Sequence, residues 1–505
     1  MTLSGNRLYD LIRSRAPESR RIFADLGDGR GVTYAEIEAG SARYANALAS
    51  LGVAPGDRVA VQVEKSIDVI MLYLGCLRAG AVFLPLNTAY TAAEVDYFLD
   101  DAGPKLFVRD PSRSDPVRTE GGPVVMTLDA AEAGSIVDLA RAQLATFSNA
   151  PRGPDDLAAI LYTSGTTGRS KGAMLSHENL AANSLTLVDV WRFTSDDVLI
   201  HALPIFHTHG LFVATNVALL SGASVIFLPR FDPKQILAVM PRATAMMGVP
   251  TFYTRLLQEP GLDRAAAAGM RLFISGSAPL LAETHREWRE RTGHAILERY
   301  GMTETNMNTS NPYDGERVAG TVGPPLRGVE LRIADPETGA LLGPNEVGMI
   351  EVRGPNVFRG YWRMPEKTAK EFRPDGFFIT GDLGKIDSDG YVHIVGRARD
   401  LVITGGFNVY PKEVETEIDT IAGVLESAVI GVPHADFGEG VTAVVVRRDG
   451  ATLTESDVLR ALESRLAKFK LPKRVIFVES LPRNTMGKVQ KNVLRESYRA
   501  IYGAR

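Results

Sequence analysis

A loop rich in glycine and hydroxyl side chains, ending in a lysine, is the segment of this sequence best suited to chemistry. Residues 162–172 read YTSGTTGRSKG and follow the apolar run 157–161. Glycines let backbone N–H groups turn toward an anion, hydroxyls add donors, and the lysine adds positive charge. The segment is not a Walker loop, because no Gly-Lys-Ser/Thr follows the required gap. Its composition favours polyphosphate binding, while a flexible surface loop is the alternative that this segment alone leaves open.

Glu304 is a second candidate. It lies in the run YGMTET at residues 300–305, after an expected strand at 295–299. A carboxylate at a strand end, beside a flexible glycine, can bind Mg²⁺, which takes oxygen ligands and often keeps phosphate oxygens as partners. Taken alone, a solvated turn glutamate is the simpler interpretation.

Two further motifs carry charged groups next to glycine. Asp382 ends the tripeptide Thr-Gly-Asp, where a carboxylate can accept hydrogen bonds from a ribose diol, as the acidic residue of dinucleotide sites does. Arg397 follows a glycine and offers a planar fork of donors. Near the C-terminus, LPRNTMGK at residues 481–488 presents Lys488 on a loop bounded by proline and glycine. Hairpin turns and a solvent-exposed lysine are the simpler alternatives for each motif by itself.

The elements that must position these residues follow from hydrophobic periodicity. In the first three hundred residues, apolar strands at 58–63, 81–84 and 105–108 alternate with helical patterns at 67–78 and 92–101. Further strands are expected at 198–203, 224–228, 243–247 and 272–275. This alternation is typical of layered α/β architecture with largely parallel sheets.

The pattern changes beyond about residue 315. Short apolar runs between Gly, Pro and Asp turns favour antiparallel strands, forming a small β-barrel. A mixed pattern then returns, with helices expected at 411–421 and 455–467 and strands at 427–432 and 442–446. We therefore expect a large domain at residues 1–398 and a small α+β domain at residues 399–505.

Length and composition restrict the class of protein. A chain of 505 residues exceeds one ordinary core, and its 45% apolar and 23% charged content is ordinary for a globular protein. The net charge of −4 gives no general attraction to nucleic acid or anionic lipid. One cysteine, no signal pattern at the N-terminus and no stretch of spanning length lead us to expect a cytoplasmic protein without nucleic-acid or membrane partners.

In combination and in this order, the motifs resemble the adenylate-forming acyl-CoA synthetases, a family that includes firefly-type luciferases and peptide-synthetase adenylation domains. The resemblance covers nearly the whole chain. It implies an AMP-binding adenylation domain and a mobile C-terminal domain. It also implies a ligase that uses ATP and Mg²⁺ to form an acyl-adenylate and pyrophosphate, and then transfers the acyl group to coenzyme A. In such reactions the protein mainly positions groups and stabilises charge.

The same resemblance implies roles for individual residues. Thr303 would contact the α-phosphate, Glu304 would bind Mg²⁺, and Asp382 and Arg397 would fix the ribose. The nucleotide-binding residues, from the phosphates to the adenine on which Tyr300 would stack, would be Thr163, Ser164, Gly165, Thr166, Thr167, Lys171, Ser277, Ala278, Glu298, Arg299, Tyr300, Asp382 and Arg397.

Lys488 would bridge the attacking carboxylate and the α-phosphate, an attraction strongest where water is excluded. The C-terminal domain would then rotate about a hinge at Arg399, after which Gly405 and Gly406 would line the pantetheine tunnel. Lys470, in a basic cluster, would meet the phosphates of coenzyme A, with an ordinary solvated face as the alternative. Acylation of Lys488 by a lysine acyltransferase, reversed by a deacylase, would remove the charge that adenylation needs.

The acid pocket is expected to be small and polar. Ser277 and Met302 would line it, and His207 matches the family's gate position near the acyl group. A buried second carboxylate needs a compensating cation, which His207 and Arg286, on a helix expected at 280–290, would supply. We therefore predict a short dicarboxylic acid as the substrate. The alternative is that Arg286 is a surface residue paired with Glu290.

The runs at 201–210, 248–253 and 275–288 also resemble malonyl-CoA synthetases. This favours malonate, and methylmalonate, as the acid that is activated. A medium-chain or 4-coumarate-like monocarboxylate CoA ligase is the main alternative. A domain that loads a carrier protein, a luciferase-like oxygenase and a catalytically inactive nucleotide-binding scaffold are further alternatives, the last disfavoured because Glu304 and Lys488 are both present.

Overall fold

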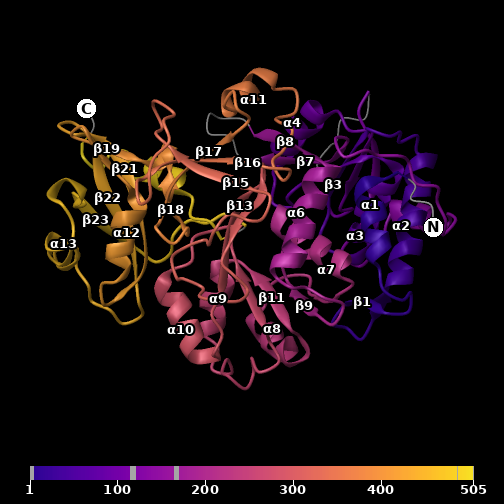
Figure 1. Cartoon of the computed structure of the whole chain (residues 1–505), viewed down its shortest axis with the longest axis horizontal. Helices are drawn as coiled ribbons and strands as arrows, with labels where there is room; N and C mark the ends of the chain where they lie inside the picture. Colours follow the sequence, from indigo (N-terminus) through magenta and orange to yellow (C-terminus); the bar gives the residue numbers. More distant parts are fainter. Residues whose placement is uncertain (1–4, 114–120, 164–169, 486, 504–505) are drawn as a thin grey trace. The chain divides into compact units, whose positions relative to one another are not determined.

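The computed structural model describes residues 5–113, 121–163, 170–485 and 487–503, which form two compact units (Figure 1). The first unit comprises Met1–Glu330 and Val352–Phe378. The second comprises Leu331–Glu351 and Ile379–Arg505. Each unit has hydrophobic clusters of its own.

A six-stranded sheet in the first unit has the order β6-β5-β3-β4-β7-β8. Its strands are β3 (Arg58–Gln62), β4 (Val82–Pro85), β5 (Leu106–Arg109), β6 (Val124–Thr127), β7 (Leu157–Thr163) and β8 (Lys171–Ser176). All neighbours are parallel except β7 and β8, which are antiparallel. The central strands β3, β4 and β5 are buried, as expected for parallel strands covered on both faces.

A second sheet in the same unit has eight strands, in the order β14-β13-β12-β11-β9-β10-β1-β2. They are β1 (Ile22–Asp25), β2 (Gly31–Thr33), β9 (Val198–His201), β10 (Ser224–Phe227), β11 (Ala245–Gly248), β12 (Leu272–Ser275), β13 (Leu297–Met302) and β14 (Asn306–Ser310). The interior is parallel, and the two outermost pairs are antiparallel. The predicted alternation of strands and helices is therefore confirmed.

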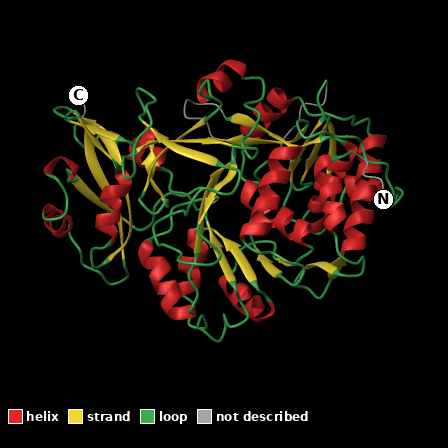
Figure 2. Ribbon diagram, viewed as in Figure 1, coloured by secondary structure: helices red, strands yellow, loops and turns green. Residues whose placement is uncertain are grey.

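Helices α1, α2, α3, α6 and α7 form a layer between these two sheets (Figure 2). Capping boxes at Thr33, Thr91 and Ser176 start α2, α4 and α6, because a hydroxyl and the side chain three residues on satisfy each other's backbone donors. The helices of this unit are α1 (Arg7–Arg15), α2 (Tyr34–Ser50), α3 (Ile67–Ala79), α4 (Ala92–Ala102), α5 (Ser135–Arg141), α6 (His177–Val190), α7 (Asn216–Ser221), α8 (Pro233–Val239), α9 (Pro250–Leu257), α10 (Ala282–Thr292) and α11 (Pro365–Glu371), together with a π-helix, η1 (His209–Thr215).

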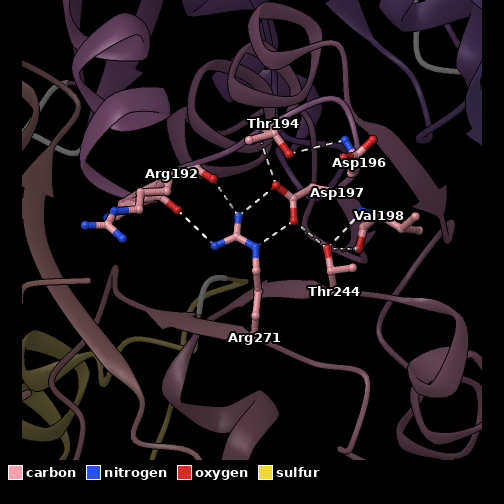
Figure 3. A network of polar contacts seen from close by, with 8 residues as sticks. Arg192, Thr194, Asp196, Asp197, Val198, Thr244 and Arg271 are labelled. Carbon is pink, nitrogen blue, oxygen red and sulfur yellow. Dashed lines mark hydrogen bonds and ion pairs between the residues drawn. The ribbon is translucent and has the colours of Figure 1, made fainter. Parts of the chain in front are cut away.

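An ion pair between the buried Asp197 and the half-buried Arg271 ties the starts of β9 and β12 together (Figure 3). Arg271 Nε and Nη2 lie 2.7 and 2.8 Å from the two carboxylate oxygens of Asp197, and Thr244 Oγ1 donates at 2.7 Å. Arg271 also donates to the carbonyl of Arg192 at 3.1 Å. Burial acts to raise the pKa of Asp197, but these bonds outweigh it and lower the pKa. The pair thereby fixes the loop after α6 to the sheet.

The second unit contains two sheets. The region expected to form a small β-barrel contains a four-stranded sheet, β15 (Glu330–Ala334), β16 (Gly348–Arg353), β17 (Phe378–Ile386) and β18 (Val392–Arg397), in that order. The other sheet has the order β20-β19-β22-β21, with β23 paired to β22. Its strands are β19 (Val402–Thr404), β20 (Phe407–Val409), β21 (Val424–His434), β22 (Gly438–Arg447) and β23 (Arg474–Val478), and its helices are α12 (Pro411–Asp419), α13 (Glu455–Glu463) and α14 (Lys491–Ser497).

The compact units group the four-stranded sheet with the C-terminal residues. The domain boundary after residue 398, and the mobility of the C-terminal domain, stay predictions. Among the described residues, no helix is both long and apolar enough to cross a membrane.

Candidate active site

Strands β7 and β8 hold the two ends of the glycine-rich loop side by side. Thr163 ends β7, Lys171 begins β8, and the two residues are partners in the antiparallel register. Lys171 is buried, with Nζ 4.1 Å from the centre of the Tyr361 ring and 3.8 Å from the Glu371 carboxylate. The residues expected to contact phosphates inside the loop, which lie outside the described residues, are Ser164, Gly165, Thr166 and Thr167.

Glu304 lies beside the start of the glycine-rich loop and, as its motif predicts, follows a strand, β13. Its side chain is buried, and Oε1 accepts hydrogen bonds from the Tyr361 hydroxyl at 3.1 Å and from Thr163 Oγ1 at 3.4 Å. A buried carboxylate beside the hydroxyl that begins the glycine-rich loop suits a hard cation such as Mg²⁺, which takes oxygen ligands. The structure thus brings together Thr163, Lys171 and Glu304, which are far apart in the sequence.

Arg299, on β13, is a charged side chain enclosed by the first unit. It is buried, and its Nε and Nη2 atoms have no hydrogen-bond partner. The guanidinium packs against Gly276, where an added Cβ would lie 2.4 Å from its Cζ. Burial lowers the pKa of Arg299 to about 9. A buried cation with unpartnered donors is costly unless an anion compensates it.

Two histidines, His207 and His209, border this arginine. The His209 backbone N–H donates to His207 Nδ1 at 3.3 Å, and His209 Nδ1 lies 3.2 Å from Ser277 Oγ. Burial, and then Arg299, lowers the pKa of His207 to about 4, and the same two causes lower that of His209 well below its usual value. Both rings are therefore neutral near pH 7, and Arg299 is the one cation among these four residues.

The π-helix η1 begins at His209 and was not predicted. His201 Nε2 lies 3.0 Å from the Gly210 carbonyl and 3.1 Å from Thr215 Oγ1, so it fixes the first turn of this helix. Lys65, which is buried, donates to the His201 carbonyl at 2.7 Å and lies 3.1 Å from its Nδ1. π-helical turns are frequent at functional sites. Sequence reasoning missed Lys65, His201 and His209; the spacing His-x-His at 207–209 was the available signal.

The expectation that Arg286 supplies a buried cation is wrong. Arg286 is exposed on α10. The side of this helix that faces the core carries His285, Trp288 and Thr292, so a residue one position after His285 points away from it. Arg299, which the resemblance had assigned to the nucleotide, has the burial and the unpartnered donors that Arg286 lacks.

The remaining predicted residues of this unit lie on the loop after β12 and along β13. Ser277 has a left-handed backbone, with φ of 72°, which costs energy for a non-glycine residue and is found at functional sites. Glu298 is buried beside Arg299. The other predicted site residues in this part of the chain keep part of their surface exposed: Ala278, Tyr300, Met302 and Thr303. Their roles toward adenine, the α-phosphate and the acid stay predictions.

In the second unit, Asp382 and Arg397 are partners across β17 and β18. Arg397 Nε lies 2.9 Å from Asp382 Oδ1, and Asp382 is buried. Gly381, with φ of 73°, makes the turn that brings the aspartate into this position. The sequence had suggested the two residues as a pair, and the structure places them together.

Lys488 and the expected hinge lie in the same unit. Burial, and then the nearby Arg397, lowers the pKa of Lys488 to about 8. Arg399 sits in a short 3₁₀ turn, Ala398–Asp400. Gly405 and Gly406, with φ of 57° and 82°, form the tight turn between β19 and β20 that two left-handed residues make best. Lys470 forms an ion pair with Glu413.

The first unit combines layered α/β sheets with a glycine-rich hairpin that contains a lysine and lies beside a buried glutamate. The second unit carries a further lysine on a loop. Together these features indicate a nucleotide-dependent ligase. The chain belongs to the AMP-binding enzyme family, whose model matches residues 13–362, with the AMP-binding enzyme C-terminal domain matching residues 413–488.

Several known proteins are similar over almost the whole chain. The ATP-bound crystal structure of MatB from Rhodopseudomonas palustris is 64% identical, with a TM-score of 0.97, and the match covers 99% of this chain and 100% of that one. A feruloyl-CoA synthase of an Amycolatopsis species is 37% identical over 96% of this chain and 97% of its own length. A malonate–CoA ligase of Arabidopsis thaliana is 33% identical over 96% of this chain and 87% of its own length.

Proposed function

We propose that this protein is an AMP-forming malonate–CoA ligase, which makes malonyl-CoA, AMP and pyrophosphate from malonate, ATP and coenzyme A, and which also takes methylmalonate. The observation that carries the proposal is Arg299, a buried guanidinium with two unpartnered nitrogen atoms. The malonate–CoA ligase of Arabidopsis thaliana, similar over 96% of this chain, supports the same choice of acid.

Arg299 distinguishes a dicarboxylate from a monocarboxylate. In malonate one carboxylate is activated, and the other must be held in a buried pocket at the cost of its hydration. A guanidinium with free N–H groups compensates that cost through charge-assisted hydrogen bonds. A monocarboxylate would leave the same N–H groups unsatisfied, which is costly in a buried site. His207, His209 and Ser277 add neutral polar groups around the same position.

The nucleotide roles rest on the geometry of each unit taken separately. In the first unit, Thr163 and Lys171 would bind the β- and γ-phosphates of ATP, and Glu304 would bind Mg²⁺, which would neutralise phosphate charge. Thr303 would contact the α-phosphate. In the second unit, the Asp382 carboxylate would accept hydrogen bonds from the ribose hydroxyls, with Arg397 fixing the carboxylate.

Lys488 would act in adenylation alone. Its ammonium would lower the repulsion between the malonate carboxylate and the α-phosphate while the carboxylate oxygen attacks phosphorus and pyrophosphate leaves. For thioester formation, rotation about Arg399 would replace Lys488 by the turn at Gly405 and Gly406, and Lys470 would bind coenzyme A. Because its pKa is about 8, Lys488 carries a larger fraction of neutral amine than an ordinary lysine, which favours acylation by a lysine acyltransferase.

The test is coenzyme A-dependent thioester formation across malonate, methylmalonate, succinate, butyrate, octanoate and 4-coumarate. We expect the highest kcat/KM for malonate, with methylmalonate next. A butyrate or 4-coumarate value equal to that for malonate would overturn the choice of acid while leaving the family assignment intact. Release of pyrophosphate without thioester formation would overturn the role of coenzyme A.

A further inference from the structure

The loop that carries Lys488 is anchored at both ends in the core of the second unit. Leu481 is buried in a cluster formed by β21, β22 and α14, and Val489 packs against the same cluster. The Gln490 N–H donates to the Pro482 carbonyl at 2.8 Å, and Arg483 and Val489 are paired in a short antiparallel bridge. The ends of the loop are therefore fixed, and the position of Lys488 depends on what holds the residues between them.

Asn484 closes the loop on itself. Its N–H donates to the Lys488 carbonyl at 3.0 Å, and its Oδ1 accepts the Lys488 N–H at 2.9 Å. The Gly487 N–H donates to the Asn484 carbonyl at 2.9 Å, with Gly487 at φ of 71°. These bonds define the shape of the turn.

Arg483 connects this turn to β21. One terminal nitrogen of its guanidinium forms an ion pair with Glu426 on β21, and the other donates to the Gly487 carbonyl, directly before Lys488. Glu426 stands at a β-bulge, an irregularity that re-aims strand side chains. A planar guanidinium can bind two acceptors at once in a fixed geometry, which a lysine cannot do.

We infer that Glu426 and Arg483 are positioning residues for Lys488: the pair clamps the Gly487 carbonyl to β21 and so fixes the backbone from which the catalytic ammonium extends. The inference rests on the proposed role of Lys488 in adenylation. An ordinary ion pair of this exposure, with 28% and 25% of the two side chains accessible, would contribute little to stability. What is specific here is the second bond of the same guanidinium, which is made to the loop.

The consequence is a defect confined to one half-reaction. A lysine that must contact two anions at once is sensitive to position, and a displacement of about 1 Å can cost about a hundredfold in rate. Thioester formation from a supplied acyl-adenylate does not use Lys488. Loss of the clamp is therefore expected to slow adenylation and to spare the second step, whereas general damage to the second unit would slow both.

The experiment compares Glu426→Gln and Arg483→Lys with wild-type protein in both half-reactions: malonate-dependent pyrophosphate release, and thioester formation from synthetic malonyl-adenylate and coenzyme A. Glu417→Gln is the matched control. Glu417 lies on α12 and forms an ion pair with Arg465 at 3.8 Å, which the substitution removes. Lys488→Ala defines the pattern expected for complete loss of the ammonium. Thermal unfolding of each variant reports whether the chain is folded.

We expect both clamp variants to lose about ten- to a hundredfold in adenylation, to keep thioester formation, and to unfold near the wild-type temperature. Glu417→Gln should match wild type in both steps. If Lys488→Ala separates the two steps and the clamp variants do not, the inference is overturned and the proposed function stands. If Lys488→Ala slows both steps equally, the proposed function of Lys488 fails first. If one clamp variant does not fold, the other decides.

Discussion

The guanidinium of Arg299 lies directly against the α-carbon of Gly276, so that a Cβ at that glycine would stand 2.4 Å from the arginine's Cζ. A side chain at this position would therefore displace the guanidinium, while the backbone itself would accept one, since its φ is not positive. The contact makes the position of the buried cation testable without removing it.

Gly276→Ala is expected to displace the guanidinium and to raise the KM for malonate, by about a hundredfold if the shift reaches 1 Å. Its backbone accommodates alanine, so the unfolding temperature should change little. Gly261→Ala is the control, because an added Cβ there meets only the Leu237 side chain, at 3.7 Å. Steady-state kinetics with malonate and butyrate would measure both. An unchanged KM for malonate in Gly276→Ala would show that Arg299 does not contact the acid.

Arg299 and Arg286 make opposite predictions for selectivity. Arg299→Met keeps the volume of the side chain and removes its donors, so the ratio of kcat/KM for malonate to that for butyrate should fall by about a hundredfold or more. Arg286→Ala, at an exposed position, should leave the ratio unchanged. A fall in the ratio for Arg286→Ala alone would restore the original expectation and refute the assignment to Arg299.

The pH dependence of adenylation should report Lys488. Its pKa is lowered to about 8, so the ammonium that adenylation needs is present below pH 8 and is lost as the pH rises through that value. The kcat/KM for malonate-dependent pyrophosphate release should therefore fall above pH 8, since this ratio reports the free enzyme. Lys488→Arg should move the fall to about pH 9, where Arg299 begins to lose its charge, because the new guanidinium itself stays charged. A flat profile to pH 10 in the wild type would contradict the role of this amine.

Asp419 should limit the stability of the second unit above neutral pH. Burial raises its pKa to about 7, despite Lys412 and a hydrogen bond from Ser427 at 2.7 Å. The folded state thus holds a proton that the unfolded state releases, so stability is greatest below the unfolded pKa, near 4, and falls as the pH rises toward 7.

Asp419→Asn removes this cost and keeps the oxygen that accepts from Ser427. We expect the variant to gain about 1–2 kcal/mol at pH 8, after allowance for the partial exposure of the side chain, and to match wild type below pH 4. Urea unfolding across this pH range is the measurement. A gain that is independent of pH would show that packing, and not ionisation, is responsible.

The sequence predicted the strand ends that carry Thr163, Lys171 and Glu304, because each of these residues adjoins an apolar run. Thr163 and Lys171 end and begin two apolar runs, which pair as β7 and β8 of the six-stranded sheet. Glu304 follows a third run, which forms β13 of the eight-stranded sheet, and its contact with Thr163 joins ends of two different sheets. The strand and helix boundaries were close for the same reason: β12 was predicted at its observed bounds, and Ile67–Ala79 within one residue.

The acid side was harder because burial of a cation leaves no local pattern. Arg286 and Arg299 are both charged residues near apolar runs, and only the full helix shows that His285, Trp288 and Thr292 occupy the inner face of α10. The π-helix at His209 depends on contacts of the His201 ring, eight positions earlier, which in turn lies against the buried Lys65. Such tertiary dependence is invisible to periodicity.

The neutral histidines beside Arg299 have one more consequence. With the pKa of His207 at about 4 and that of Arg299 at about 9, Arg299 carries the positive charge and His207 is neutral near pH 7. The charge of these protein groups therefore does not change with the acid that binds. Recognition depends on the protonation state of the acid: a dicarboxylic acid that keeps one proton has one negative charge fewer to pair with Arg299, and so binds more weakly.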